Sequence, residues 1–202
     1  MLRLFPTIRY DLRCKAEWCY ESTAAKSIIK ALLTDGTMAM LIYRLMQWSR
    51  GRGLWPLEMF FNKLNAVLNH CIIGRGAEFG PGFILIHATG VIINGDVRGG
   101  SRIYIEHQVT IGADNRRSPM IASDVFIGAG ARVIGNIKVG DGARIGANAV
   151  VLEDVPDFCT VAGVPAKVVR RRTPAPSEKP LIGSMAPLLA PKSSTFDPAD
   201  HP

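Results

Sequence analysis

With 202 residues, of which 48% are hydrophobic and 20% charged, the chain has the composition of a globular protein with one main domain and a smaller appendage. Its formal net charge of +7 suits a polyanionic small molecule, but the basic residues are not interleaved with aromatic ones, which argues against a nucleic-acid-binding surface. The four cysteines have neither metal-site spacing nor a disulfide framework, and no secretory signal or membrane-spanning apolar run is visible, so we expect a soluble cytoplasmic protein.

Residues 1–68 are predicted to form an N-terminal helical domain. Residues 27–33 and 38–48 have the apolar spacing of helices, and the Asp35-Gly36 pair between them is a turn signal. Residues 54–68 are expected to form a further helix, with Pro56 tolerated near its start. These helices would cover the open end of the repeat that follows, whose free strand edges would otherwise invite association.

An apolar residue then returns every six residues. Thirteen of the fourteen positions fit this period: Ile73, Phe79, Leu85, Val91, Val97, Ile103, Val109, Ile121, Ile127, Val133, Val139, Ile145 and Val151. A period of six matches neither a helix nor an ordinary strand. It is typical of a parallel β-helix, in which three six-residue sides make one coil of about eighteen residues. We therefore expect residues 69–170 to form a mainly β, hexapeptide-repeat domain.

Two segments depart from this period. Residues 112–120 place polar side chains, among them Arg117, where an apolar one is due, so this segment must leave the coil as a loop of the kind on which binding groups collect. Residues 171–202 are rich in proline, serine and alanine, and we expect them to form a disordered tail.

His87 is the best candidate for a catalytic side chain. It lies two positions after the inward Leu85, which predicts that it faces outward, and small residues follow it. An imidazole on a rigid outer face is well suited to act as a general base.

Five motifs now point to a family: ILIHATGVII at 84–93, QVTIG at 108–112, IGAGARVIGNI at 127–137, IGANAVVL at 145–152 and AGVPAK at 162–167. In these the chain resembles the serine acetyltransferase family, including relatives that acetylate sugar hydroxyls in exopolysaccharide synthesis. The resemblance implies left-handed coiling, a homotrimer or a multiple of trimers, and acetyl-CoA bound between neighbouring subunits. It also implies that His87 takes the proton from an acceptor hydroxyl, which attacks the thioester directly.

The resemblance also implies roles for other residues, with no metal required. Backbone N–H groups near Gly112 would hold the oxyanion, and Arg117 would contact the acceptor or a phosphate. The cofactor would lie along small residues and meet a lysine at its phosphates: Ala129, Gly130, Ala147 and Lys167. Because the chain ends in Asp200-His201-Pro202 and not in isoleucine, we expect no complex with cysteine synthase.

The acceptor is left open between L-serine and a sugar hydroxyl. Family members carry an aspartate at the positions of Ile86 and Ile72, where this chain is apolar. His107 stands where serine acetyltransferases usually have glutamine, which is closer to the sugar acetyltransferases. With an eighteen-residue coil, His107 would lie one strand above His87 and two residues along, with Glu106 as an orienting carboxylate. The alternative is that His107 is a packed corner histidine turned partly inward.

Two other classes of protein compete with this reading. A non-catalytic hexapeptide scaffold would account for the missing family aspartates. A carbonic-anhydrase-like solenoid would bind zinc through histidines about one coil apart, here His70, His87 and His107.

Overall fold

The computed structural model describes residues 3–172, so the predicted tail lies outside the described residues except for Arg171 and Arg172. Four helices form the N-terminal domain: α1 (Leu4–Tyr20), α2 (Ala25–Leu32), α3 (Thr37–Arg50) and α4 (Trp55–Asn69). The last three correspond to the helices expected from the sequence. Among the described residues no helix is both long and apolar enough to span a membrane.

The first helix was not expected, because its buried face is only partly apolar. Asp11 and Lys15 are among the residues that α1 buries, and they break the pattern by which an amphipathic helix is recognised in a sequence. The Asp11 and Lys15 side chains have their partners outside α1.

The following strands are short. They are β1 (Ile72–Ile73), β2 (Glu78–Phe79), β3 (Phe83–Leu85), β4 (Ile92–Ile93), β5 (Arg98–Gly99), β6 (Ile103–Ile105), β7 (Thr110–Gly112), β8 (Met120–Ile121), β9 (Phe126–Ile127), β10 (Arg132–Ile134), β11 (Lys138–Val139), β12 (Arg144–Ile145), β13 (Val150–Val151), β14 (Cys159–Ala162) and β15 (Lys167–Arg171).

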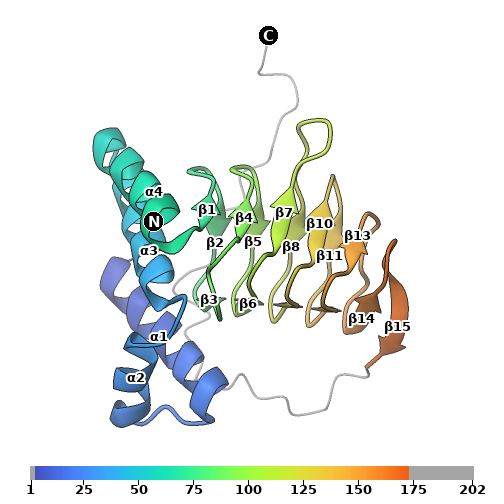
Figure 1. Cartoon of the computed structure of the whole chain (residues 1–202), viewed down its shortest axis with the longest axis horizontal. Coiled ribbons are helices and arrows are strands. Elements are labelled where there is room, and N and C mark those ends of the chain that lie inside the picture. The colour runs from blue at the N-terminus through green and yellow to red at the C-terminus, as the bar shows by residue number, and fades with distance from the viewer. Residues whose placement is uncertain (1–2, 173–202) are drawn as a thin grey trace.

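From β1 to β13, strands that are three apart in the chain pair with one another, which gives a three-sided solenoid. The sheets have the orders β1-β4-β7-β10-β13, β2-β5-β8-β11 and β3-β6-β9-β12-β14-β15, and all neighbours are parallel except the antiparallel pair β14 and β15 at the end. The fold is the left-handed parallel β-helix that was expected. The helices gather at one end of the solenoid, and β15 lies at the other (Figure 1).

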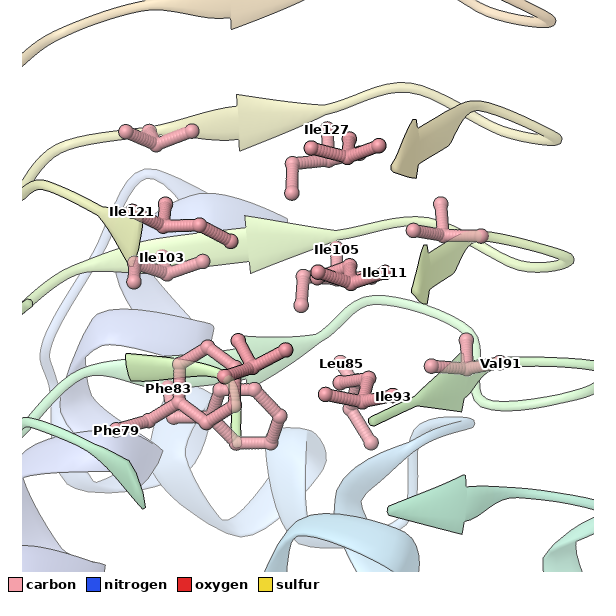
Figure 2. Close-up of a cluster of buried hydrophobic side chains, with 14 of the residues drawn as sticks. Phe79, Phe83, Leu85, Val91, Ile93, Ile103, Ile105, Ile111, Ile121 and Ile127 are labelled. Atoms are coloured by element: carbon pink, nitrogen blue, oxygen red, sulfur yellow. The ribbon is translucent and has the colours of Figure 1, made fainter. Parts of the chain in front are cut away.

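The thirteen apolar positions are all buried, but they do not form one continuous column. Leu85 pairs with Ile105, so this first coil spans twenty residues, not eighteen. The two extra residues follow Leu85 and shift the phase. As a result Val91 lies two residues before Ile93, which stacks under Ile111 in the next coil. Figure 2 shows these side chains in successive layers. Each six-residue side has two buried positions. After the shift, the apolar residues of the six-residue period occupy the other buried position, so the period in the sequence is unbroken although the register has changed.

The polar interruption leaves the coil as a loop between β7 and β8, as predicted, and it projects beyond the other turns (Figure 1). Asp114 and Arg117 exchange backbone hydrogen bonds of 3.0 and 2.9 Å across its tip. The two residues between them have positive φ angles of 46° and 63°. The tip is therefore a tight two-residue turn that exposes Arg117.

A buried ion pair joins the helices to the first coil. The Arg44 guanidinium of α3 donates from Nε to Asp11 Oδ2 of α1 at 2.6 Å, and both side chains are only 2% exposed. Arg44 also donates to the carbonyl groups of Phe79 and Gly80 at 2.9 and 2.7 Å. Asp11 accepts from the Gly82 N–H at 2.6 Å. These contacts hold α1 and α3 against the end of the solenoid, as expected of a cap.

The helical domain also covers part of one side of the solenoid. Trp18, near the end of α1, stacks on Tyr104 of β6 with ring centroids 4.7 Å apart, and on Phe126 of β9 at 5.4 Å. This places the C-terminal end of α1 beside the second and third coils.

Candidate active site

His87 lies on the outer surface of the first coil, as expected from its place after Leu85. The strand β3 ends at Leu85, and the N–H of the buried Ile86 still donates to the Ile105 carbonyl at 2.9 Å. The His87 side chain is 50% exposed. A rigid backbone thus holds an accessible imidazole at the edge of the solenoid.

His107 lies directly above His87 in the next coil, and the expectation that it lies two residues along was wrong. Leu85 pairs with Ile105, so the two histidines, each two residues further on, are in register. Their ring centroids are 6.0 Å apart at an interplanar angle of 73°. The His107 side chain is 47% exposed, so it is not turned inward as a packed corner histidine would be.

Each of these imidazoles has a carboxylate near Nδ1. His87 Nδ1 is 3.3 Å from Asp35 Oδ2, and His107 Nδ1 is 3.6 Å from Glu106 Oε2. The carboxylate next to His87 therefore comes from the helical domain, and Glu106 accompanies His107 instead. From the sequence, Asp35 was recognised only as part of a turn, since nothing in the local pattern places that turn beside a strand fifty residues later.

A pocket of about 510 Å³ opens at this place between the helical domain and the first two coils. Its lining is mostly polar or small: Asp35, Gly36, Leu68, Asn69, His70, His87, Ala88, Thr89, His107 and Gln108. His70 is the C-cap of α4, with a left-handed backbone of φ 48°, and its side chain lines this pocket. The sequence placed it near His87 only in the zinc alternative. Three imidazoles, two amides and a hydroxyl give such a pocket donors and acceptors for a hydroxylated ligand.

Small residues continue the line of the two histidines along the same corner of the solenoid. The ladder pairs Ile105 with Ile127 and Ile127 with Ile145. Two residues beyond these lie His107, Ala129 and Ala147, one above another. The Asn148 N–H donates to the Ala129 carbonyl at 2.8 Å, which holds the corners together. Because Ala129 and Ala147 have small side chains, an extended ligand could lie along this corner with little obstruction. Successive coils along it are ~4.8 Å apart.

The remaining predicted binding residues lie apart from the pocket. Gly112 ends β7 where the projecting loop begins. Gly130 follows Ala129, and its N–H donates to the His107 carbonyl at 2.9 Å. Lys167 begins β15 and forms an exposed ion pair of 3.2 Å with Glu153. Arg117 is exposed on the loop.

The zinc alternative required His70, His87 and His107 to act together. All three line the pocket, but within residues 3–172 no group of three or more His, Cys, Asp or Glu side chains is arranged to hold a metal ion.

Comparisons with known proteins agree with this geometry. The family model for bacterial transferase hexapeptide repeats (six repeats) matches residues 118–153. The serine acetyltransferase of Synechococcus elongatus is 35% identical over 173 residues, which cover 83% of this chain and 70% of that protein. The solved serine acetyltransferase of Vibrio cholerae superposes with a TM-score of 0.74 at 35% identity, over 87% of this chain and 69% of that one.

A solved serine acetyltransferase from Brucella abortus in complex with coenzyme A gives a TM-score of 0.74 at 30% identity, over 84% of this chain and 70% of that one. The aligned regions cover more than four-fifths of this chain, so they include helices as well as the repeat. The chain belongs to the serine acetyltransferase family of hexapeptide acyltransferases.

Proposed function

We propose that the protein transfers an acetyl group from acetyl-CoA to an acceptor hydroxyl, with His87 as the general base and L-serine as the first acceptor to test. The observation that carries the proposal is the line from His87 through His107 to Ala129 and Ala147. It joins an exposed imidazole in a polar pocket to a corner of small residues. The relative solved with coenzyme A supports a CoA thioester as the donor.

In the proposed reaction, the imidazole of His87 accepts the hydroxyl proton while the oxygen attacks the thioester carbonyl carbon. A C–O bond forms and, when the tetrahedral intermediate collapses, the C–S bond breaks. The imidazolium returns the proton to the departing thiolate, so the products are an acetyl ester and free CoA. Backbone N–H groups near Gly112 would stabilise the oxyanion if a bound thioester places its carbonyl there.

The donor would run along the corner formed by Ala129, Gly130 and Ala147 toward Lys167. This lysine can exchange its exposed partner Glu153 for a phosphate, since a surface ion pair of this kind contributes little on its own. In the proposed homotrimer, a neighbouring copy supplies the other wall of this groove. All four cysteines are unpaired, which supports a cytoplasmic location.

A sugar hydroxyl is the second candidate acceptor, and a specific feature favours it. Ile86, next to His87, is 9% exposed and offers no charge to a bound ligand. Ile72 is equally apolar. Among the described residues that line the pocket, Asp35 is the one carboxylate. A small neutral polyol would make better use of this mostly uncharged lining than an amino acid would.

The test is release of free thiol from acetyl-CoA by purified protein with L-serine, homoserine and a panel of sugars, with the acetylated product identified by mass. We expect acceptor-dependent release with L-serine or a sugar, and its loss in His87→Asn. His107→Asn, run beside it, shows whether the second imidazole takes part. Release with none of the acceptors would overturn the proposal in favour of the non-catalytic scaffold.

A further inference from the structure

We propose that Asp35, in the turn between α2 and α3, is the residue that positions His87. This inference rests on the proposed function and concerns the same site. It starts from the 3.3 Å separation between Asp35 Oδ2 and His87 Nδ1. The Asp35 side chain makes no other hydrogen bond or ion pair within residues 3–172 and is 82% exposed, so it is available to the imidazole.

The turn is packed against the end of β3, the strand that leads to His87. Gly36 has a left-handed backbone, φ 75°, and packs so closely on β3 that a Cβ at this position would overlap the Leu85 carbonyl oxygen. It would also lie 3.0 Å from the Leu85 carbonyl carbon and 3.2 Å from the Ile86 oxygen. Leu85 and Ile86 are the two residues before His87. The carboxylate and the imidazole are therefore mounted on two backbones in direct contact.

A buried lysine ties the same two segments together. Lys15 of α1 is 0% exposed, and its Nζ donates to the Leu85 carbonyl at 2.8 Å and to the Asp35 carbonyl. No carboxylate of the described residues lies within ion-pair distance of this ammonium, and burial lowers the pKa of Lys15 to about 8. A buried, unpaired ammonium is costly. By donating to both carbonyl groups, Lys15 fixes the distance between the turn and the end of β3.

The remaining side of the turn is fixed by hydroxyl groups. Thr37, at the start of α3, is buried and donates from its hydroxyl to the Ala31 carbonyl at 2.6 Å. Thr34 donates to the same carbonyl at 2.8 Å. With Lys15 and Gly36, these contacts leave the turn little freedom, although the Asp35 side chain itself is exposed.

A carboxylate at Nδ1 has a defined chemical effect. It favours the tautomer that carries the proton on Nδ1, which leaves the Nε2 lone pair free to accept a proton from the acceptor hydroxyl. It also stabilises the imidazolium that forms during transfer, as the aspartate does in a catalytic triad. In this chain the acidic partner comes from the helical cap, and the solenoid residue next to His87 is the apolar Ile86.

The experiment compares Asp35→Asn, Asp35→Glu and His87→Asn with Asp96→Asn. Asp96 lies exposed on the turn between β4 and β5, so its variant makes the same change of charge without touching His87. We expect Asp35→Asn to lower kcat about 10- to 100-fold with KM for the acceptor nearly unchanged, less than the ~10⁴-fold loss for a buried triad aspartate because Asp35 is exposed. Asp35→Glu should recover part of the rate.

Nitrogen-15 spectra of histidine-labelled protein supply a readout independent of turnover. The His87 signal, identified by its loss in His87→Asn, should show a larger Nε2-protonated fraction in Asp35→Asn than in Asp96→Asn. An unchanged tautomer ratio together with an unchanged kcat would overturn the inference.

The outcomes also separate this inference from the proposed function. If Asp35→Asn raised only KM for L-serine and left kcat intact, Asp35 would be a ligand of the acceptor ammonium group, and the positioning role would be wrong. If His87→Asn retained full activity, the proposed function itself would fail. Loss in His87→Asn with normal Asp35→Asn would refute the positioning role alone.

Discussion

Replacing Gly36 by alanine tests both the packing of the turn and its part in activity. The backbone at Gly36 is left-handed, and an L-residue pays about 1–2 kcal/mol in that conformation. The added methyl group also overlaps the Leu85 carbonyl, which belongs to a strand and cannot rotate away as a side chain could. Overpacking of this kind costs a further 1–3 kcal/mol or so. We therefore expect Gly36→Ala to lose about 2–5 kcal/mol of unfolding free energy.

Gly53→Ala is the matched control. Gly53 has nearly the same backbone angle, φ 71°, but open space where a Cβ would stand. It should lose only the conformational part, about 1–2 kcal/mol. The difference between the two variants thus isolates the contact between the turn and β3. Both should be unfolded in urea at the same protein concentration, because assembly makes apparent stability concentration-dependent.

The same pair of variants tests the link to catalysis. To relieve the overlap the turn must withdraw from β3 by several tenths of an ångström or more, which carries Asp35 away from His87. We expect kcat of Gly36→Ala to fall toward that of Asp35→Asn, while Gly53→Ala keeps the wild-type rate. Equal stability of the two alanine variants would refute the packing argument, and a normal kcat in a destabilised Gly36→Ala would refute the functional one.

Two further predictions concern buried charges. Arg44→Met leaves the carboxylate of Asp11 buried without its cation, so it should lower the unfolding free energy measured in urea by about 3–5 kcal/mol. The double variant with Asp11→Leu should lose less than the sum of the two single changes. A loss below about 1 kcal/mol in Arg44→Met would contradict this expectation. Burial lowers the pKa of Lys15 from 10.5 to about 8, so the protonated form is destabilising below pH 8 and this penalty fades as pH rises toward 10.5. The unfolding free energy of the wild type relative to Lys15→Met should therefore increase by about 3 kcal/mol over that window, and a flat difference would contradict it.

The period of six was enough to predict the solenoid and its core, because both buried positions of each side accept apolar residues. It could not give the register. The two residues inserted after Leu85 preserve the sequence period while moving Val91 to the second buried position of its side. Only the pairing of strands reveals this shift, and it decides that His107 lies directly above His87.

The site was predictable where its residues belong to the repeat. His87, Ala129 and Ala147 lie on one corner because the repeat places them there. Asp35 could not be found in this way, since its position depends on how the helical cap docks. That docking is set by buried polar groups such as Lys15, whose partners are backbone carbonyls and leave no trace in a sequence pattern.

The central claim is that His87 removes the proton from the acceptor. The most direct measurement is kcat/KM for acetyl transfer to the acceptor found in the thiol-release assay, compared between the wild type and His87→Asn after both are shown to unfold at the same urea concentration. General-base catalysis predicts a loss of about 10²- to 10⁴-fold in His87→Asn. A folded His87→Asn that transfers acetyl within a few-fold of the wild-type rate would contradict the account.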